Sequence, residues 1–179
     1  MASLKFHDRR LAQVAFVVDD IETAMRDHGR ELHIGAWSLF SNFKFETLTY
    51  RGDPCLVEMT AAIAFSGEMM YELIQQTNDA PSVYLEAIQK TGFGFHHYGL
   101  MVESLDGAVK EYEARGHVLA QYSLTPNGIR AAYMDARPGV PGMVELLEIS
   151  AAASEIFEPV YEAAKAWDGT SFSVTRYGG

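Results

Sequence analysis

Two apolar stretches of this chain follow the same pattern, and that internal repeat constrains the fold more than any other feature. Residues 11–18 (LAQVAFVV) and 95–102 (FHHYGLMV) are rich in β-branched and aromatic residues, which predicts buried strands, and each leads straight into a helix start. Each also carries one polar side chain with metal-binding capacity at the same place in its pattern, Gln13 in the first and His97 in the second. Two strands matched in this way predict a duplicated module.

The ends of the two copies match as well. Residues 71–75 (YELIQ) align with residues 144–148 (VELLE) at an offset of 73, whereas Gln13 and His97 are 84 positions apart. Shorter loops in the second copy explain the difference, because loops tolerate deletions best. Both copies show the hydrophobic pattern of a strand, a helix and three further strands. Two copies indicate a duplication and not a solenoid, which needs more repeats.

The chain is long enough for two such modules to share one core. We expect an α+β fold in which two βαβββ modules form a curved mixed sheet around a cavity, followed by a C-terminal helix. Within the first module, the aromatic residues 36–49 predict a strand or hairpin, and residues 55–65 predict the next strand. The expected segments are an N-terminal segment (1–10), a first module (11–76), a linker helix (77–93), a second module (94–150) and a C-terminal helix with a tail (151–179).

Charge and cysteine content exclude several classes of partner. Asp and Glu number 24 against 14 Lys and Arg, which gives a net charge of −10, so neither nucleic acid nor an anionic membrane is an expected partner. The single cysteine, Cys55, excludes an intramolecular disulfide and suits a reducing compartment. The longest apolar run, residues 61–65, is far shorter than the ~20 residues that span a bilayer. We therefore expect a cytoplasmic protein with no membrane partner.

Strand geometry selects one histidine of the pair His96 and His97. Side chains alternate between the two faces of a strand, so Gln13 lies on the cavity side of the first strand if the residues on either side of it pack against the helix. The same alternation places His97 on the cavity side of its strand and directs His96 and Tyr98 to the opposite face. His97 is therefore the expected ligand.

If the two copies pack symmetrically, four polar side chains point into the shared cavity together: Gln13, Glu72, His97 and Glu145. Two carboxylates, one imidazole and one amide carbonyl suit zinc, nickel, cobalt, manganese or iron(II) in a site with positions left open for a substrate. Each residue alone has an ordinary structural explanation. Their occurrence at equivalent positions of a repeat is what predicts a divalent metal site.

From residue 11 to residue 149 the chain resembles the vicinal oxygen chelate superfamily, also called the glyoxalase/bleomycin resistance/dioxygenase group. The resemblance implies paired βαβββ modules around a metal, with ligands Gln13, Glu72, His97 and Glu145. Residues 71–122 look most like methylmalonyl-CoA epimerase, through the E-L strand end, the short linker helix and the GFHH segment at 94–97. That family has His at the position of Gln13, whereas the set Gln/Glu/His/Glu resembles eukaryotic-type glyoxalase I. It argues against extradiol dioxygenases, whose iron needs two His and one carboxylate.

The resemblance implies a metal-dependent isomerase, epimerase or lyase that removes a proton α to a carbonyl and stabilises the resulting enolate through the metal. Its substrate is expected to be a small carbonyl or acyl compound, and family analogy suggests a homodimer. We predict Glu145 as the base, with Glu72 as the second choice. Trp37, Tyr98 and Arg130 are candidate substrate contacts. Core packing is the better explanation for Trp37 and Tyr98, and an exposed strand position is an equally good explanation for Arg130.

Two other classes of function remain open from the sequence. The aromatic run from residue 37 to residue 45 and the missing first His also fit a metal-free protein of the drug-sequestering kind, which would bind a small molecule in the same fold. A structural or interaction module has weaker support, from the C-terminal helix and the acidic surface alone. Metal content separates the first two classes.

Overall fold

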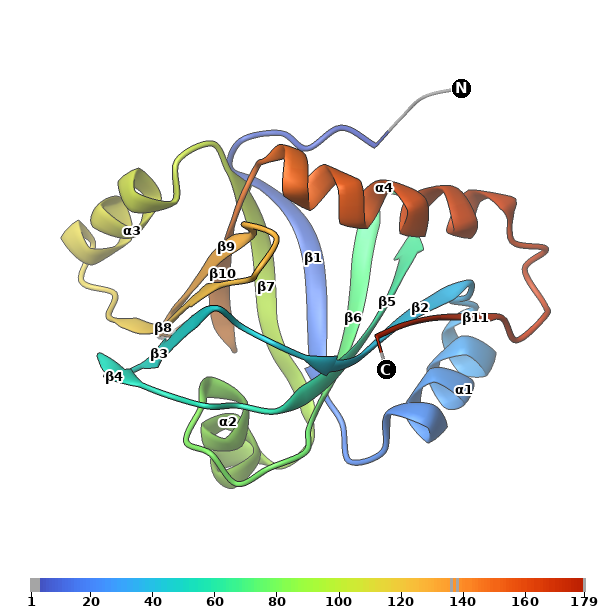
Figure 1. The fold of residues 1–179 in the computed structure, drawn as a ribbon, viewed down its shortest axis with the longest axis horizontal. Helices are drawn as coiled ribbons and strands as arrows, with labels where there is room; N and C mark the ends of the chain where they lie inside the picture. The colour runs from blue at the N-terminus through green and yellow to red at the C-terminus, as the bar shows by residue number, and fades with distance from the viewer. Residues whose placement is uncertain (1–3, 136, 138, 179) are drawn as a thin grey trace.

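The computed structural model describes residues 4–135, 137 and 139–178, which form four helices and one mixed sheet of eleven strands (Figure 1). This confirms the α+β class. Within these residues, no helix is both long and apolar enough to cross a membrane. The elements of the first half are β1 (Arg10–Val17), α1 (Ile21–Leu32), β2 (Trp37–Phe43), β3 (Thr47–Tyr50), β4 (Asp53–Pro54), β5 (Met59–Ser66) and β6 (Met69–Gln76). Those of the second half are α2 (Val83–Thr91), β7 (Gly94–Val102), α3 (Leu105–Ala114), β8 (Leu119–Leu124), β9 (Arg130–Met134), β10 (Met143–Glu148), α4 (Ala151–Ala166) and β11 (Val174–Tyr177).

The order of the strands shows the duplication directly. Across the sheet the order is β11-β2-β5-β6-β1-β7-β10-β9-β8-β3-β4, so the run β2-β5-β6-β1 is mirrored by β8-β9-β10-β7. The first strands of the two copies, β1 and β7, pair antiparallel at the centre, and each pairs in parallel with the last strand of its own copy, β6 or β10. The four strands predicted to carry metal ligands are therefore neighbours.

Two helices begin at capped positions directly after the central strands. The Asp20 carboxylate accepts a hydrogen bond from the Thr23 amide at the start of α1, and the Ser104 hydroxyl accepts one from the Gly107 amide at the start of α3. Helix α1 packs on β5 and β6, and α3 packs on β9 and β10, on one face of the sheet. Helix α4 covers the opposite face (Figure 1).

The segment between β2 and β5 crosses from one half of the sheet to the other. Strand β3 pairs with β8 at the far edge, and β4 completes a hairpin with it, so β5 begins only at Met59 instead of at residue 55. The residues predicted as a tail also contain a strand, β11, which pairs in parallel with β2. An edge strand has free backbone N–H and C=O groups. Strand β3 pairs with these groups on β8, and β11 pairs with them on β2, and in both cases the partner is distant in sequence. A local pattern does not specify which edge a strand joins.

Helix α4 lies across the face of the sheet opposite to α1 and α3 (Figure 1). The repeat of its apolar residues at helical spacing predicts this helix, which the structure confirms at Ala151–Ala166. Its buried residues Ala153, Phe157 and Val160 share one core cluster with Ile63 of β5 and Leu147 of β10. The helix thus packs against both halves of the sheet at once.

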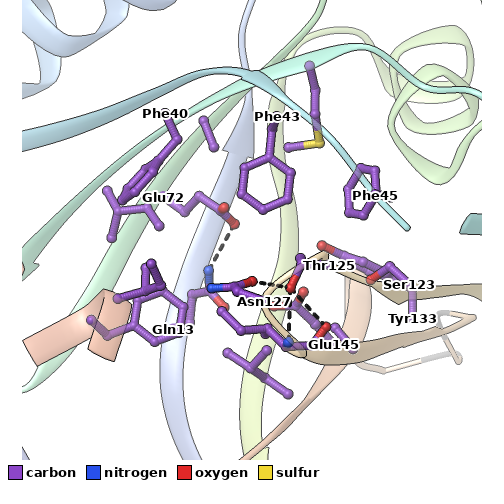
Figure 2. A pocket seen from close by; sticks show the side chains of 18 of the residues that line it. Gln13, Phe40, Phe43, Phe45, Glu72, Ser123, Thr125, Asn127, Tyr133 and Glu145 are labelled. Carbon is purple, nitrogen blue, oxygen red and sulfur yellow. Dashed lines mark hydrogen bonds between the residues drawn. The ribbon is translucent and has the colours of Figure 1, made fainter. Parts of the chain in front are cut away.

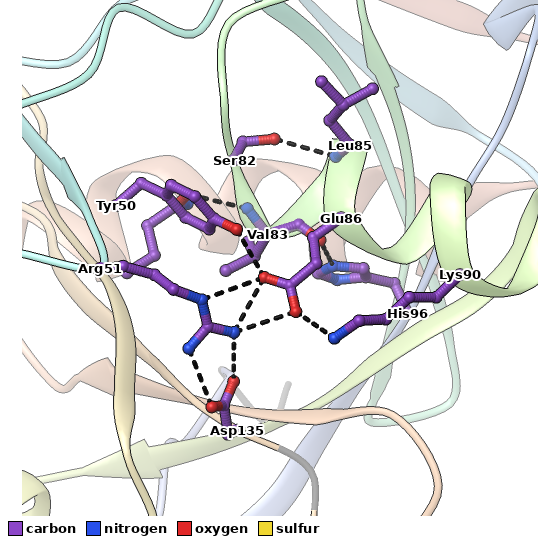
Figure 3. A network of polar contacts seen from close by, with 10 residues as sticks. Tyr50, Arg51, Ser82, Val83, Leu85, Glu86, Lys90, His96 and Asp135 are labelled. Carbon is purple, nitrogen blue, oxygen red and sulfur yellow. Dashed lines mark hydrogen bonds and ion pairs between the residues drawn. The ribbon is translucent and has the colours of Figure 1, made fainter.

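A network of charged side chains ties α2 to the second half of the sheet (Figure 3). Arg51, in the turn between β3 and β4, donates hydrogen bonds to Glu86 of α2 at 2.8 Å and to Asp135 at 2.9 Å. Tyr50 donates to Glu86 at 2.6 Å, and Lys90 forms an ion pair with the same carboxylate. Burial alone raises the pKa of Glu86, but the hydrogen bonds from Lys90, Tyr50 and Arg51 outweigh it and lower the pKa to about 2.

We expect Glu86→Gln to reduce the free energy of unfolding at pH 7 by about 2 kcal/mol, after allowing for solvent screening around the exposed partners. The lowered pKa means that this stabilisation is complete above the ordinary carboxyl range near 4.5 and is lost as the pH falls toward 2. Urea unfolding of both proteins between pH 3 and pH 7 measures this. The difference in the free energy of unfolding between wild type and variant should become smaller below pH 4.5. A difference that stays constant over this range would contradict the lowered pKa of Glu86.

Candidate active site

The structure brings the four predicted ligands together on four adjacent strands. Gln13 lies on β1, Glu72 on β6, His97 on β7 and Glu145 on β10. Gln13 Nε2 donates a hydrogen bond to Glu72 Oε2 at 2.8 Å (Figure 2). His97 Nε2 lies 3.3 Å from Glu145 Oε2 and 3.7 Å from Glu72 Oε2. All four residues are largely buried. The side chain of Glu72 is 12% exposed, that of Glu145 is 9% exposed, and that of His97 is fully buried.

Two acceptor atoms of this set have no hydrogen-bond partner in the described part of the chain. They are Gln13 Oε1 and His97 Nε2, and both are buried. A buried acceptor without a donor is costly, and a bound cation would satisfy both atoms. A side chain at Gly99 would clash with the Gln13 amide, so the absence of one there leaves room for the amide. Among the described residues, no group of three or more His, Cys, Asp or Glu side chains is placed so that it could hold a metal ion by itself, and the Gln13 amide would be a further donor. The chemistry of the donors fits a divalent metal.

The charge of Glu145 acts on Glu72. Burial first, and then the charge of Glu145, raise the pKa of Glu72 well above its usual range. Two like charges held this close in a buried site favour either a shared proton or a cation between them. Glu72 also accepts the hydrogen bond from Gln13, whereas Glu145 accepts no side-chain hydrogen bond from any described residue and lies beside the ring of His97. Glu145 is therefore the freer of the two carboxylates.

His96 does not point to the opposite face, and this expectation was wrong. In the pairing of β1 with β7, Ala15 lies opposite His97 and Phe16 lies opposite Phe95, so His96 is the extra residue of a β-bulge. Alternation holds only where the ladder is continuous, and the bulge turns both imidazoles inward. His96 is 2% exposed, and its Nδ1 lies 2.8 Å from His97 Nδ1. Burial, and then the neighbouring His97, lower the pKa of His96 to about 3.

A cavity of about 120 Å³ opens beside these residues (Figure 2). One wall is aromatic, with Phe40, Phe43 and Phe45, while the β8–β9 hairpin supplies the polar groups Ser123, Thr125 and Asn127. The carboxylates of Glu72 and Glu145 and the amide of Gln13 also line it, and Ile156 and Phe157 of α4 cover it. Both halves of the sheet thus contribute to one small, largely apolar space with charge on one side.

Two tyrosines of the cavity were not anticipated from the sequence. The hydroxyls of Tyr84 and Tyr133 form a hydrogen bond of 3.1 Å, which uses one of their two protons and leaves the other free to be donated. Burial raises the pKa of both phenols, so they are neutral donors at pH 7. Tyr133 lies directly opposite Glu145 in the pairing of β9 with β10, so the strand register could have identified it.

None of the three predicted substrate contacts lines this cavity. Trp37 is 1% exposed and packs among residues of α1 and Tyr71 on the other face of the sheet. Tyr98 points away from the cavity, as alternation requires after the bulge, and its ring contacts Phe95. Arg130 donates hydrogen bonds to Glu148 and Asp106, and these acidic partners hold it beside α3. The suggestion that these three residues contact a substrate in this cavity is therefore not supported.

Comparison with known proteins agrees with this architecture. A family model described as glyoxalase/bleomycin resistance protein/dioxygenase superfamily matches residues 12–133. A search of curated protein sequences finds no match. Among solved structures, a hypothetical protein from Bacillus halodurans is 19% identical with a TM-score of 0.57, over 80% of this chain and 96% of that one. Methylmalonyl-CoA epimerase from Mycobacterium tuberculosis is 15% identical with a TM-score of 0.54, over 81% and 91%.

A variant methylmalonyl-CoA epimerase from Streptomyces coelicolor, in complex with 2-nitronate-propionyl-CoA, is 14% identical with a TM-score of 0.51, over 81% of this chain and all of that one. At these identities the likeness concerns the fold. The family model, however, spans well over half of the chain, from β1 into β9. This protein therefore belongs to the glyoxalase/bleomycin resistance protein/dioxygenase, or vicinal oxygen chelate, superfamily.

Proposed function

We propose that this protein is a metal-dependent isomerase, epimerase or lyase that removes a proton α to a carbonyl group of a small substrate. One observation carries the proposal: four side chains with metal-binding capacity meet on the four central strands, and two of their acceptor atoms, Gln13 Oε1 and His97 Nε2, are buried without a donor. A divalent cation held by Gln13, Glu72, His97 and Glu145 would act as a Lewis acid toward negative charge on a substrate oxygen.

The protein's own residues account for the proton transfer. Glu145 is the base, because it lines the cavity and has no hydrogen bond that restrains it, whereas Gln13 holds Glu72 in place. The proton leaves the carbon of the substrate for a Glu145 oxygen, and the electron pair of the C–H bond moves into the enolate. The unused hydroxyl proton of the Tyr84–Tyr133 pair can be donated to that enolate oxygen. Return of this proton from Glu145 to a neighbouring atom of the enolate gives isomerisation. Epimerisation needs a proton delivered to the opposite face of the carbon by a second acid, for which Glu72 is the candidate, while Glu145 keeps the proton that it removed.

The size of the cavity supports a small reacting group. A volume of about 120 Å³ is below the ~300–1,000 Å³ of typical drug-sized sites, and α4 covers it. A short acyl or carbonyl group fits this space, with its apolar part against Phe40, Phe43 and Phe45. Methylmalonyl-CoA epimerases with this fold have been solved with acyl-CoA ligands, which makes a short acyl thioester a reasonable first probe.

Two measurements on the purified chain test the proposal. Metal-stripped protein is titrated with Co²⁺ and followed by its visible absorption, and methylmalonyl-CoA and smaller 2-substituted acyl thioesters are incubated with the loaded protein in D₂O. We expect one Co²⁺ per chain and exchange of the α-proton seen by NMR. Absence of both Co²⁺ binding and exchange would reject the enzyme.

The alternative is a metal-free small-molecule binding protein, and the aromatic wall of the cavity favours it. In that case an aromatic ligand would bind with the same affinity before and after treatment with a chelator. It would also exchange no proton with the solvent. Loss of ligand binding on chelation would instead exclude this alternative.

A further inference from the structure

The bulge in β7 gives His96 a specific relation to His97. Both imidazoles are at least 98% buried, and they lie edge to face with their Nδ1 atoms 2.8 Å apart. The other nitrogen of His96, Nε2, lies 3.2 Å from the backbone carbonyl oxygen of Val83, at the start of α2. The ring of His96 also packs on Tyr84 and Tyr133, which leaves it little freedom to rotate.

These contacts determine where the protons lie. A carbonyl oxygen only accepts hydrogen bonds, so His96 Nε2 carries a proton and donates it to Val83. A neutral imidazole has one N–H, so His96 Nδ1 has a lone pair and accepts a hydrogen bond from His97 Nδ1. His97 then carries its proton on Nδ1, and its Nε2 has a free lone pair. That atom is the one that lies without a partner beside Glu72 and Glu145.

We propose that His96 is a positioning residue that holds His97 in the Nδ1–H tautomer, so that the lone pair of His97 Nε2 faces the two carboxylates and can bind a divalent cation. The inference rests on the proposed function for the cation, but the tautomer itself does not depend on it. Metal-binding histidines generally use their second nitrogen in a hydrogen bond of this kind, and the loss of such a partner typically weakens metal binding 10- to 100-fold.

The neighbouring carboxylates make this hydrogen bond necessary. Without an acceptor at His97 Nδ1, the proton of His97 is most stable on Nε2, from which it can be donated to Glu145 across 3.3 Å. Such a bond would occupy both a nitrogen and an oxygen that the cation requires. His96 therefore acts through His97 and does not contact the substrate.

A matched pair of variants separates this role from simple packing. His96→Asn retains an acceptor oxygen close to the position of the imidazole Nδ1, whereas His96→Leu retains volume but no acceptor. We expect His96→Leu to lower the Co²⁺ affinity at least 10-fold and His96→Asn to stay within about threefold of wild type. His28→Asn is the control, because His28 hydrogen-bonds Tyr71 on the other face of the sheet and should leave Co²⁺ affinity unchanged.

The tautomer is measured directly on metal-free protein with ¹⁵N-labelled histidine. We expect the NMR signals of His97 to show a protonated Nδ1 and an unprotonated Nε2 in wild type and in His96→Asn, and a protonated Nε2 in His96→Leu. A protonated Nε2 in wild type, or the same tautomer in all three proteins, would overturn the proposal. If wild type shows the expected tautomer but binds no Co²⁺, the role of His96 stands and the proposed metal-dependent function fails.

Discussion

Replacing Glu145 by Gln is expected to reduce Co²⁺ affinity at least 10-fold and to slow exchange of the substrate α-proton about 10²- to 10⁴-fold. The variant keeps the shape of the side chain but loses the negative charge that attracts the cation and the oxygen that takes the proton. Calorimetric titration and exchange in D₂O measure the two effects separately. Glu68→Gln, in the exposed turn between β5 and β6, is the control and should change neither.

The same variant should be more stable than wild type when no metal is present. The charge of Glu145 is one cause of the raised pKa of Glu72, and a neutral Gln removes that repulsion from the buried site. We therefore expect a free energy of unfolding at pH 7 that is equal to that of wild type or higher by up to about 1–2 kcal/mol. A Glu145→Gln protein that is destabilised and still exchanges the α-proton at the wild-type rate would refute its assignment as the base.

Replacing Trp37 by Leu is expected to reduce the free energy of unfolding by about 3 kcal/mol and to leave Co²⁺ affinity unchanged. The indole is almost fully buried and packs edge to face on Tyr71, with Ile21 and Met25 of α1 in the same cluster. Leu leaves a void in this cluster. The site is unaffected because Trp37 lies on the helix-covered face and the cavity on the other.

Urea unfolding and Co²⁺ titration of the same preparation test this prediction. Trp167→Leu serves as the comparison. Because Trp167 is only partly buried, this substitution should reduce the free energy of unfolding by less than Trp37→Leu does. Weakened binding of Co²⁺ or of a substrate in Trp37→Leu, at a temperature where the variant is fully folded, would restore Trp37 as a contact of the site.

Periodicity predicted the parts of this fold that depend on neighbouring residues in the chain. The apolar stretches that became β1 and β7 and the C-terminal helix α4 follow from local sequence. The crossing of β3 to the edge of β8 and the pairing of β11 with β2 do not. Their stability comes from backbone groups far away in the sequence, and an isolated strand pattern contains no information about its partner.

The candidate site also contains residues that the sequence predicts and residues that it does not. The four side chains proposed as metal ligands were predictable because a repeat places them at equivalent positions, and strand alternation then orients Gln13 and His97 toward one face. Tyr84 and Tyr133 were not predictable from their own segments. They come from α2 and β9, and only the packing of these elements brings them together at the cavity. The position of Arg130 was not predictable for a related reason, because the acidic side chains that bind it, Glu148 and Asp106, come from other elements.

The sequence by itself determined the duplicated βαβββ plan and the four polar residues on its central strands, because side-chain periodicity is a property of the chain alone. Only the tertiary structure decided the orientation of His96. The bulge that turns it toward His97 arises where β7 pairs with β1, and a register between two strands is set by their mutual packing and hydrogen bonds. The same is true of the covering of the cavity by α4, which needs the apolar surfaces of both halves of the sheet at once.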